Sequence, residues 1–115
     1  MSTPIFAWDN GDLLVFDSRD RMLAYVEWQD VEDGAYDVFD GEGRRLQLEV
    51  RPSTSAGARS QPEIVVTSVD DSPSQREELV GILRRALDSV SRAPATDDLP
   101  TLVAEARRVF AERHT

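Results

Sequence analysis

The chain has 115 residues, enough for one domain, and 40% of them are hydrophobic, so it can form a core without covalent cross-links. It contains no cysteine, and its single histidine, His114, lies beside the C-terminus, which argues against thiol chemistry and against Cys- or His-based metal sites. The longest apolar run, Met22–Val26, is far shorter than the roughly 20 residues that span a bilayer. With no visible targeting segment, these features predict a cytoplasmic protein without a cofactor.

The negative charge is concentrated in the first third of the chain. Residues 1–42 contain eleven acidic and two basic side chains, whereas residues 43–115 contain eleven of each, so the first segment accounts for the whole net charge of −9. Such a field repels nucleic acid and anionic membranes and complements a basic protein surface. Solubility alone also favours an acidic chain, so the asymmetry rather than the total indicates a binding surface.

The first two elements are expected to form a β-hairpin. Strands at about 4–8 and 13–17 flank Asn10-Gly11, a dipeptide that is typical of two-residue hairpin turns. The uninterrupted apolar run Leu13–Phe16 predicts a strand that is covered on both faces, and therefore a central position in the sheet.

The segment 18–28 fits either a helix or a strand. In a strand, alternate residues from Met22 to Trp28 would share a face, whereas in a helix Met22, Leu23 and Val26 would share one. We favour a short helix, because Asp17-Ser18 offers an N-cap and because Met, Leu, Ala, Arg and Glu all prefer helical structure. The elements expected next are an acidic turn (29–34), strands at 35–40 and 45–51, a surface loop (52–61) and a β-branched strand (63–69).

Two amphipathic helices are expected at the C-terminus. Ser72-Pro73 provides an N-cap and a first helical proline, and Asp98 provides the cap of the second helix. The sequence thus predicts a single α+β domain over residues 1–115. Residues 1–70 are mostly β with a short helix near 18–28, and residues 73–115 form two helices on one face of an antiparallel sheet of about five strands. The other face would be open as a docking surface.

Clustered carboxylates are the one enzymatic option that the composition leaves. The two clusters are Asp30/Glu32/Asp33 and Asp37/Asp40/Glu42, and both fall in expected turns, where acidic residues are ordinarily solvated. Their spacing does not match a calcium-binding loop, and no glycine-rich phosphate loop is present. We therefore expect a protein without catalytic activity, cofactor or metal.

One string of residues within Leu14–Leu46 forms a recognisable pattern. Its elements are Val15-Phe16-Asp17-Ser18, Glu27, Asp30-Val31, Gly34-Ala35-Tyr36, Val38-Phe39-Asp40 and Gly43-Arg44-Arg45-Leu46. The pattern resembles that of small bacterial immunity proteins that are encoded beside polymorphic toxins. The resemblance covers about a third of the chain and implies a cytoplasmic inhibitor that plugs the active site of a toxin. It identifies no toxin-contacting residue, because this family varies at its binding surface.

These observations predict an acidic protein-binding module, with an immunity protein as the first hypothesis. The alternatives are a structural or regulatory subunit of a cytoplasmic complex, for which a homodimer through the C-terminal helices is compatible, and an enzyme that uses carboxylates alone. The expected partner is a protein with a basic surface, such as a toxin domain. The residues expected to bind it are Trp28, Asp30, Glu32, Asp33, Tyr36, Asp37, Asp40 and Glu42.

Overall fold

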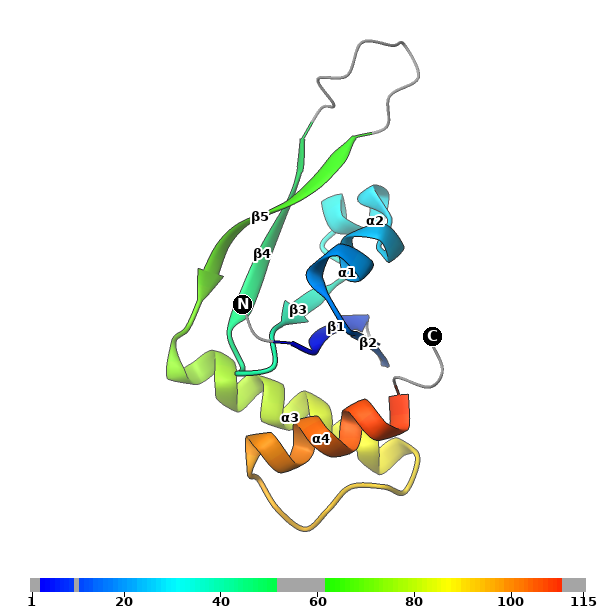
Figure 1. The fold of residues 1–115 in the computed structure, drawn as a ribbon, viewed down its shortest axis with the longest axis vertical. Coiled ribbons are helices and arrows are strands. Elements are labelled where there is room, and N and C mark those ends of the chain that lie inside the picture. The colour runs from blue at the N-terminus through cyan, green and yellow to red at the C-terminus, as the bar shows by residue number, and fades with distance from the viewer. Residues whose placement is uncertain (1–2, 10, 52–61, 111–115) are drawn as a thin grey trace.

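The structure, a computed structural model, describes residues 3–9, 11–51 and 62–110, which form an α+β fold (Figure 1). The expected surface loop at 52–61, the end of the second C-terminal helix and His114 lie outside these residues. In chain order the elements are β1 (Ile5–Asp9), β2 (Asp12–Phe16), α1 (Arg19–Tyr25), α2 (Trp28–Glu32), β3 (Asp37–Phe39), β4 (Arg45–Arg51), β5 (Glu63–Asp70), α3 (Pro73–Ser89) and α4 (Leu99–Phe110).

The five strands form one antiparallel sheet, as the sequence predicts, and their order is β2-β1-β3-β4-β5. Asp9 pairs with Asp12, so two residues connect β1 and β2, and Gly11 has a φ of +120°. The hairpin that the Asn-Gly signal predicts is therefore confirmed. The strands expected at 35–40 and 45–51 are β3 and β4, which pair as a second hairpin, although β3 spans only three residues.

The prediction of a central position for the Leu13–Phe16 strand is wrong. β2 is an edge strand, although all four of its apolar residues are buried. Helices α3 and α4 contact it on one side, and α1 contacts it from the other. An edge strand that is covered by helices on both faces gives the same continuous apolar run as a central strand, so the pattern could not distinguish the two.

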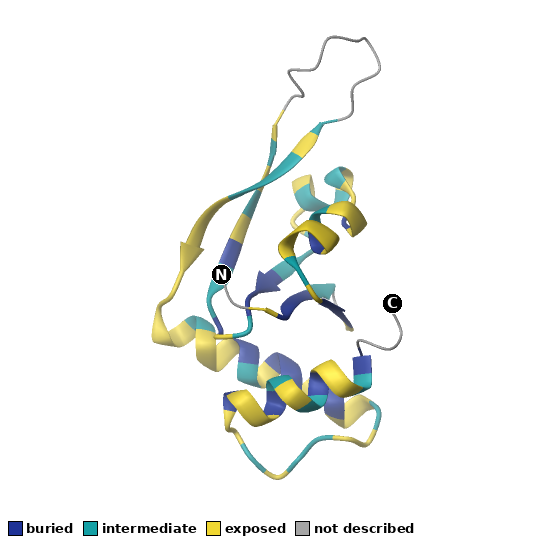
Figure 2. Ribbon diagram, viewed as in Figure 1, coloured by how far each residue is buried: buried dark blue, intermediate teal, exposed yellow. Residues whose placement is uncertain are grey.

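The C-terminal helices cover one face of the sheet, as expected. Phe6, Val15 and Phe39 project from the strands into a core with the apolar sides of α3 and α4. Leu83 and Leu102 are fully buried at this interface, and the two helices contact each other (Figure 2). None of the helices in the described part of the chain is long and apolar enough to cross a membrane.

The opposite face is not open, which corrects the expected docking surface. Two short helices cover it, and Met22 and Val26 pack against Leu14, Val38 and other strand residues in a second core. The segment 18–28 is helical as favoured, but the helix ends at Tyr25, and the expected acidic turn contains α2. Alternating large apolar residues on β1 and β3 point to both faces, so both faces required a cover.

Of the three N-caps that the sequence predicts, two are confirmed. The Ser18 side chain accepts a hydrogen bond from the Arg21 amide at 3.1 Å, and Asp98 accepts one from the Thr101 amide at 3.2 Å. At α3, the expected cap Ser72 makes no capping bond with its side chain. Asp70 instead accepts hydrogen bonds from the Ser72 amide and hydroxyl and from the Gln75 side chain. These bonds lower the pKa of Asp70.

Candidate partner-binding site

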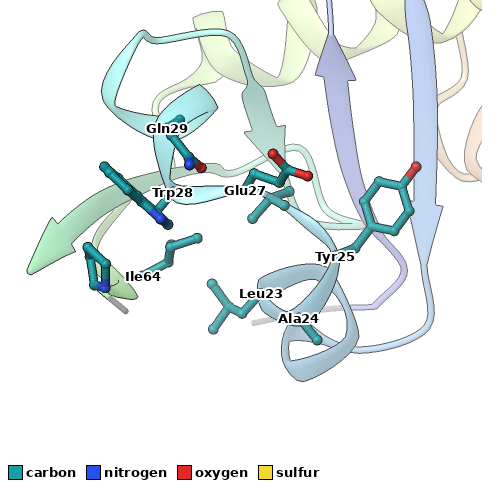
Figure 3. Close-up of a pocket in the computed structure, with 9 residues that line it drawn as sticks. Leu23, Ala24, Tyr25, Glu27, Trp28, Gln29 and Ile64 are labelled. Atoms are coloured by element: carbon teal, nitrogen blue, oxygen red, sulfur yellow. The ribbon is translucent and has the colours of Figure 1, made fainter. Parts of the chain in front are cut away.

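A groove of about 510 Å³ runs along the junction of α1 and α2 and is open to solvent (Figure 3). Trp28, Ile64 and Leu23 lie together on one side in this view, whereas the Tyr25 ring points away from them and packs against Phe16; Ala24 and Glu27 lie between. Val26, Gln29 and Pro62 complete the lining among the described residues. The groove therefore brings the two segments around α1 and α2 together with the beginning of β5.

The groove exists because the chain turns sharply between the two short helices. Val26 is extended, with φ −71° and ψ 141°, and its amide donates to the Met22 carbonyl at 3.0 Å, which ends α1. The Val26 side chain points into the second core, while Tyr25 stays 53% exposed with its ring tilted against Phe16. Tyr25 and Glu27, the residues on either side of the buried Val26, therefore lie at the surface.

Glu27 is the one charged residue in the described lining of the groove. It occupies the N-cap position of α2, but its side chain makes no capping hydrogen bond. Within the described part of the chain its carboxylate makes no ion pair or hydrogen bond, and the residue is exposed. The described lining therefore combines Trp28 and aliphatic side chains with one charged residue, Glu27, and most of its exposed surface is polar.

Helix α2 carries the first predicted acidic cluster next to this groove. Glu32 and Asp33 are exposed, and Asp30 is half-buried, where it accepts a hydrogen bond from the Tyr36 hydroxyl at 3.4 Å. Burial, together with the negative charges of Asp30 and Asp9, raises the pKa of Tyr36 to about 12. We call Asp30, Glu32 and Asp33 the acidic helix surface. Its position beside Trp28 brings five of the eight predicted residues together.

Asp37 does not belong to this surface. It lies on β3, half-buried, and forms an ion pair with Arg45. The Arg45 guanidinium also lies over the Phe39 ring at 5.6 Å and approaches Glu78 of α3 at 3.8 Å. Asp37 therefore faces the α3 side of the sheet, and its charge is compensated within the fold.

Asp40 is wrongly assigned to the surface by the sequence, because its side chain is completely buried. Its carboxylate accepts hydrogen bonds from the amides of Glu42 and Arg44, both at 3.0 Å, and from Arg44 Nε at 2.7 Å. These bonds close the turn between β3 and β4, in which Gly43 has a φ of +86°. A Cβ on Gly43 would lie 3.0 Å from the Arg76 backbone of α3. The turn therefore packs closely against α3, and this packing explains why the Asp40 side chain is buried.

Glu42 is exposed on the same turn and forms an ion pair with Arg44 at 2.9 Å. Strand β3 separates this turn from α2, because the chain passes through Asp37–Phe39 between them. The second predicted acidic cluster is therefore divided: Asp37 and Asp40 have structural partners, and Glu42 lies at the other end of β3 from the acidic helix surface. The two clusters do not converge in one cleft.

The sequence missed Leu23, Tyr25, Glu27, Pro62 and Ile64 as groove residues. Tyr25 and Glu27 could have been found, because a helix that buries Met22 and Val26 leaves the residues beside them exposed. Pro62 and Ile64 could not, because their approach depends on how β5 pairs with β4 and on how α2 packs against both strands.

No group of three or more His, Cys, Asp or Glu side chains in the described ranges is arranged to hold a metal ion. The chain matches no protein-family model, no curated protein and no solved structure.

Proposed function

We propose that this protein is an acidic protein-binding module that docks a basic partner through the acidic helix surface and the neighbouring groove. The observation that carries the proposal is the proximity of two features: three acidic residues on and beside α2, and an open groove that begins at Trp28 of the same helix. Charged residues mainly affect the association rate and the specificity, whereas aromatic and apolar residues that become buried supply most of the binding energy, and an interface uses both.

The acidic helix surface would act mainly on the rate of association. Glu32 and Asp33 are exposed and make no ion pair with a described residue, so their field reaches into solvent. Such fields accelerate encounter with a basic surface and reject acidic ones. The groove would act mainly on the lifetime of the complex, because Trp and Tyr side chains lose much exposed apolar surface when a partner covers them.

The biological role that we propose is that of a bacterial immunity protein, which acts in the cytoplasm and occludes the active site of a cognate toxin. Toxins that act on nucleic acids or nucleotides have basic clefts, which an acidic plug complements. The resemblance over Leu14–Leu46 supports this role, and in the fold that segment runs from β2 to β4 and includes both α1 and α2.

The role is tested by co-expression with the toxin-like C-terminal domain encoded by a neighbouring gene. We expect the protein to protect cells from that domain and to form a stable complex with it in purified form. Growth arrest in spite of expression, together with no complex, would refute the immunity role.

The surface assignment is tested separately on the purified complex. Changing Asp30, Glu32 and Asp33 to Arg should lower the association rate about tenfold at low salt, because the steering field is reversed. The difference should shrink near 1 M salt, where the Debye length is about 3 Å. The matched control reverses Asp71, Glu77 and Asp88, three exposed acids at or near α3, with the same change in net charge. Equal slowing by both triple variants would show that only total charge matters.

A further inference from the structure

We infer that the groove between α1 and β5 is a subsite for an arginine side chain of the partner protein. This inference rests on the proposed function for the identity of the molecule that carries the arginine. The subsite itself follows from the residues of the groove: Trp28 as the aromatic wall, Leu23 and Ile64 as aliphatic surface, and Glu27 as the single charged residue in the described lining.

An arginine side chain complements each part of this lining. Its aliphatic stem buries apolar surface against Leu23 and Ile64, while its planar guanidinium stacks on aromatic rings and pairs with a carboxylate. Glu27 is available for that pairing, because it makes neither a capping bond to α2 nor an ion pair with a described residue. An anionic or purely apolar occupant would leave this carboxylate repelled or desolvated without a partner.

The shape of the groove agrees with an occupant that arrives from solvent on another protein. The volume of about 510 Å³ lies within the range of small-molecule sites, about 300 to 1,000 Å³, but the groove is open rather than enclosed. An open groove suits a side chain presented by a protein surface together with some of its neighbouring backbone. The acidic helix surface adjoins the groove and would attract the basic residues around that arginine.

The chain provides its own reporter for this subsite. It contains two tryptophans: Trp28 lines the groove, whereas Trp8 packs against the core formed with α3 and α4. The two indole N–H signals in a ¹H–¹⁵N NMR spectrum can be assigned with Trp8→Phe and Trp28→Phe variants. Movement of the Trp28 signal alone then reports occupancy of the groove.

The probe is N-acetyl-arginine amide, titrated into the intact protein, with N-acetyl-citrulline amide as the neutral compound of nearly the same shape. We expect the arginine amide to shift the Trp28 indole signal saturably in the millimolar range and to leave Trp8 unchanged. The citrulline amide should bind about three- to fivefold more weakly, the factor expected for one exposed ionic or cation–π contact. Equal shifts with both compounds would overturn the inference.

The decisive variant is Glu27→Gln, with Glu32→Gln as the matched control on the same short helix. Glu32 is exposed but does not line the groove. Glu27→Gln should weaken binding of the arginine amide about three- to fivefold and reduce the preference over citrulline, whereas Glu32→Gln should retain both the affinity and the preference. If Glu27→Gln changes only thermal stability, Glu27 has a structural role near the α2 N-terminus and the subsite is refuted.

The outcome is independent of the surface test in the complex. Loss of arginine binding would remove the subsite even if reversal of the acidic helix surface slowed association. A subsite that binds arginine amide would likewise stand if the triple reversal left the association rate unchanged, and the proposed docking surface would then be wrong.

Discussion

The two faces of the sheet bury similar apolar residues, but they are covered by different helices. One face packs against α3 and α4, which have 17 and 12 residues, whereas the other packs against α1 and α2, which have 7 and 5. Isolated helices as short as α1 and α2 are unstable in water, so they depend on their contacts with the sheet. The long helices close a continuous core, and the short ones leave a groove at their junction. If the proposed docking surface is correct, stability and binding are therefore separated between the two faces.

The largest expected contrast between the faces concerns leucine truncation. Leu83 of α3 is fully buried, so Leu83→Ala should lower the free energy of unfolding by about 3 kcal/mol through lost burial and a cavity. Leu23 is only partly buried, so Leu23→Ala should cost about 1 kcal/mol. Urea unfolding of both variants measures the difference. A cost for Leu23→Ala as large as that for Leu83→Ala would show that the α1–α2 layer is part of the main stabilising core.

The second contrast separates two acids of one turn that look alike in the sequence. Asp40→Ala leaves two amides and a guanidinium nitrogen without their acceptor, and should cost about 2 to 3 kcal/mol in urea unfolding. Glu42→Ala removes an ion pair whose acid is 61% exposed, and should cost less than about 0.5 kcal/mol. Similar costs for the two substitutions would contradict the assignment of Asp40 as the lock of this turn.

This pair shows what could be read from the sequence and what could not. The strands, the helices other than α2, and the caps at Ser18 and Asp98 were predictable, because apolar periodicity and capping are local. The burial of Asp40 was not, because it follows from the approach of Gly43 to Arg76, an arrangement that joins distant parts of the chain. An acid in a turn is usually solvated, and only the packing of α3 against this turn reverses that expectation.

The candidate site was predictable to a similar extent. Trp28 and the acidic helix surface were found from composition and turn position, although the turn is a helix. The groove was not found, because the pattern of two helices on one face implied an open sheet on the other. A helix as short as α2 has too few residues to establish a period of 3.6, so the sequence pattern did not predict a second helical layer on the sheet.

A smaller effect tests how strongly α1 depends on its cap. Ser18→Ala removes the acceptor of the Arg21 amide and should lower stability by about 1 kcal/mol. Hydrogen exchange of the amides in α1 should accelerate more than exchange in α3 and α4, because the loss of stability is local to the layer formed by α1 and α2. Ser18→Asn should restore most of the protection. Uniform acceleration over all four helices would show that the two layers unfold as one unit.

The smallest effect distinguishes the two faces by pH. On the α1–α2 face, the raised pKa of Tyr36 means that the native state holds the phenol proton more tightly than the unfolded chain does. The associated stability is fully present below about pH 10, the ordinary tyrosine value, and is lost as the pH rises toward 12. Absorbance of the tyrosinate measures this titration, and Asp30→Asn should lower the pKa of Tyr36.

On the α3–α4 face the sign is opposite. The hydrogen bonds from Ser72 and Gln75 lower the pKa of Asp70, so its contribution is present above the ordinary aspartate value of about 4 and is lost as the pH falls through the native value. Asp70→Asn should therefore reduce the loss of stability below about pH 4 and leave the loss of stability at alkaline pH unchanged. Tyr36→Phe should affect only the loss of stability at alkaline pH. If either substitution changed the stability at both acidic and alkaline pH, the two helical layers would be electrostatically coupled through the sheet rather than separate.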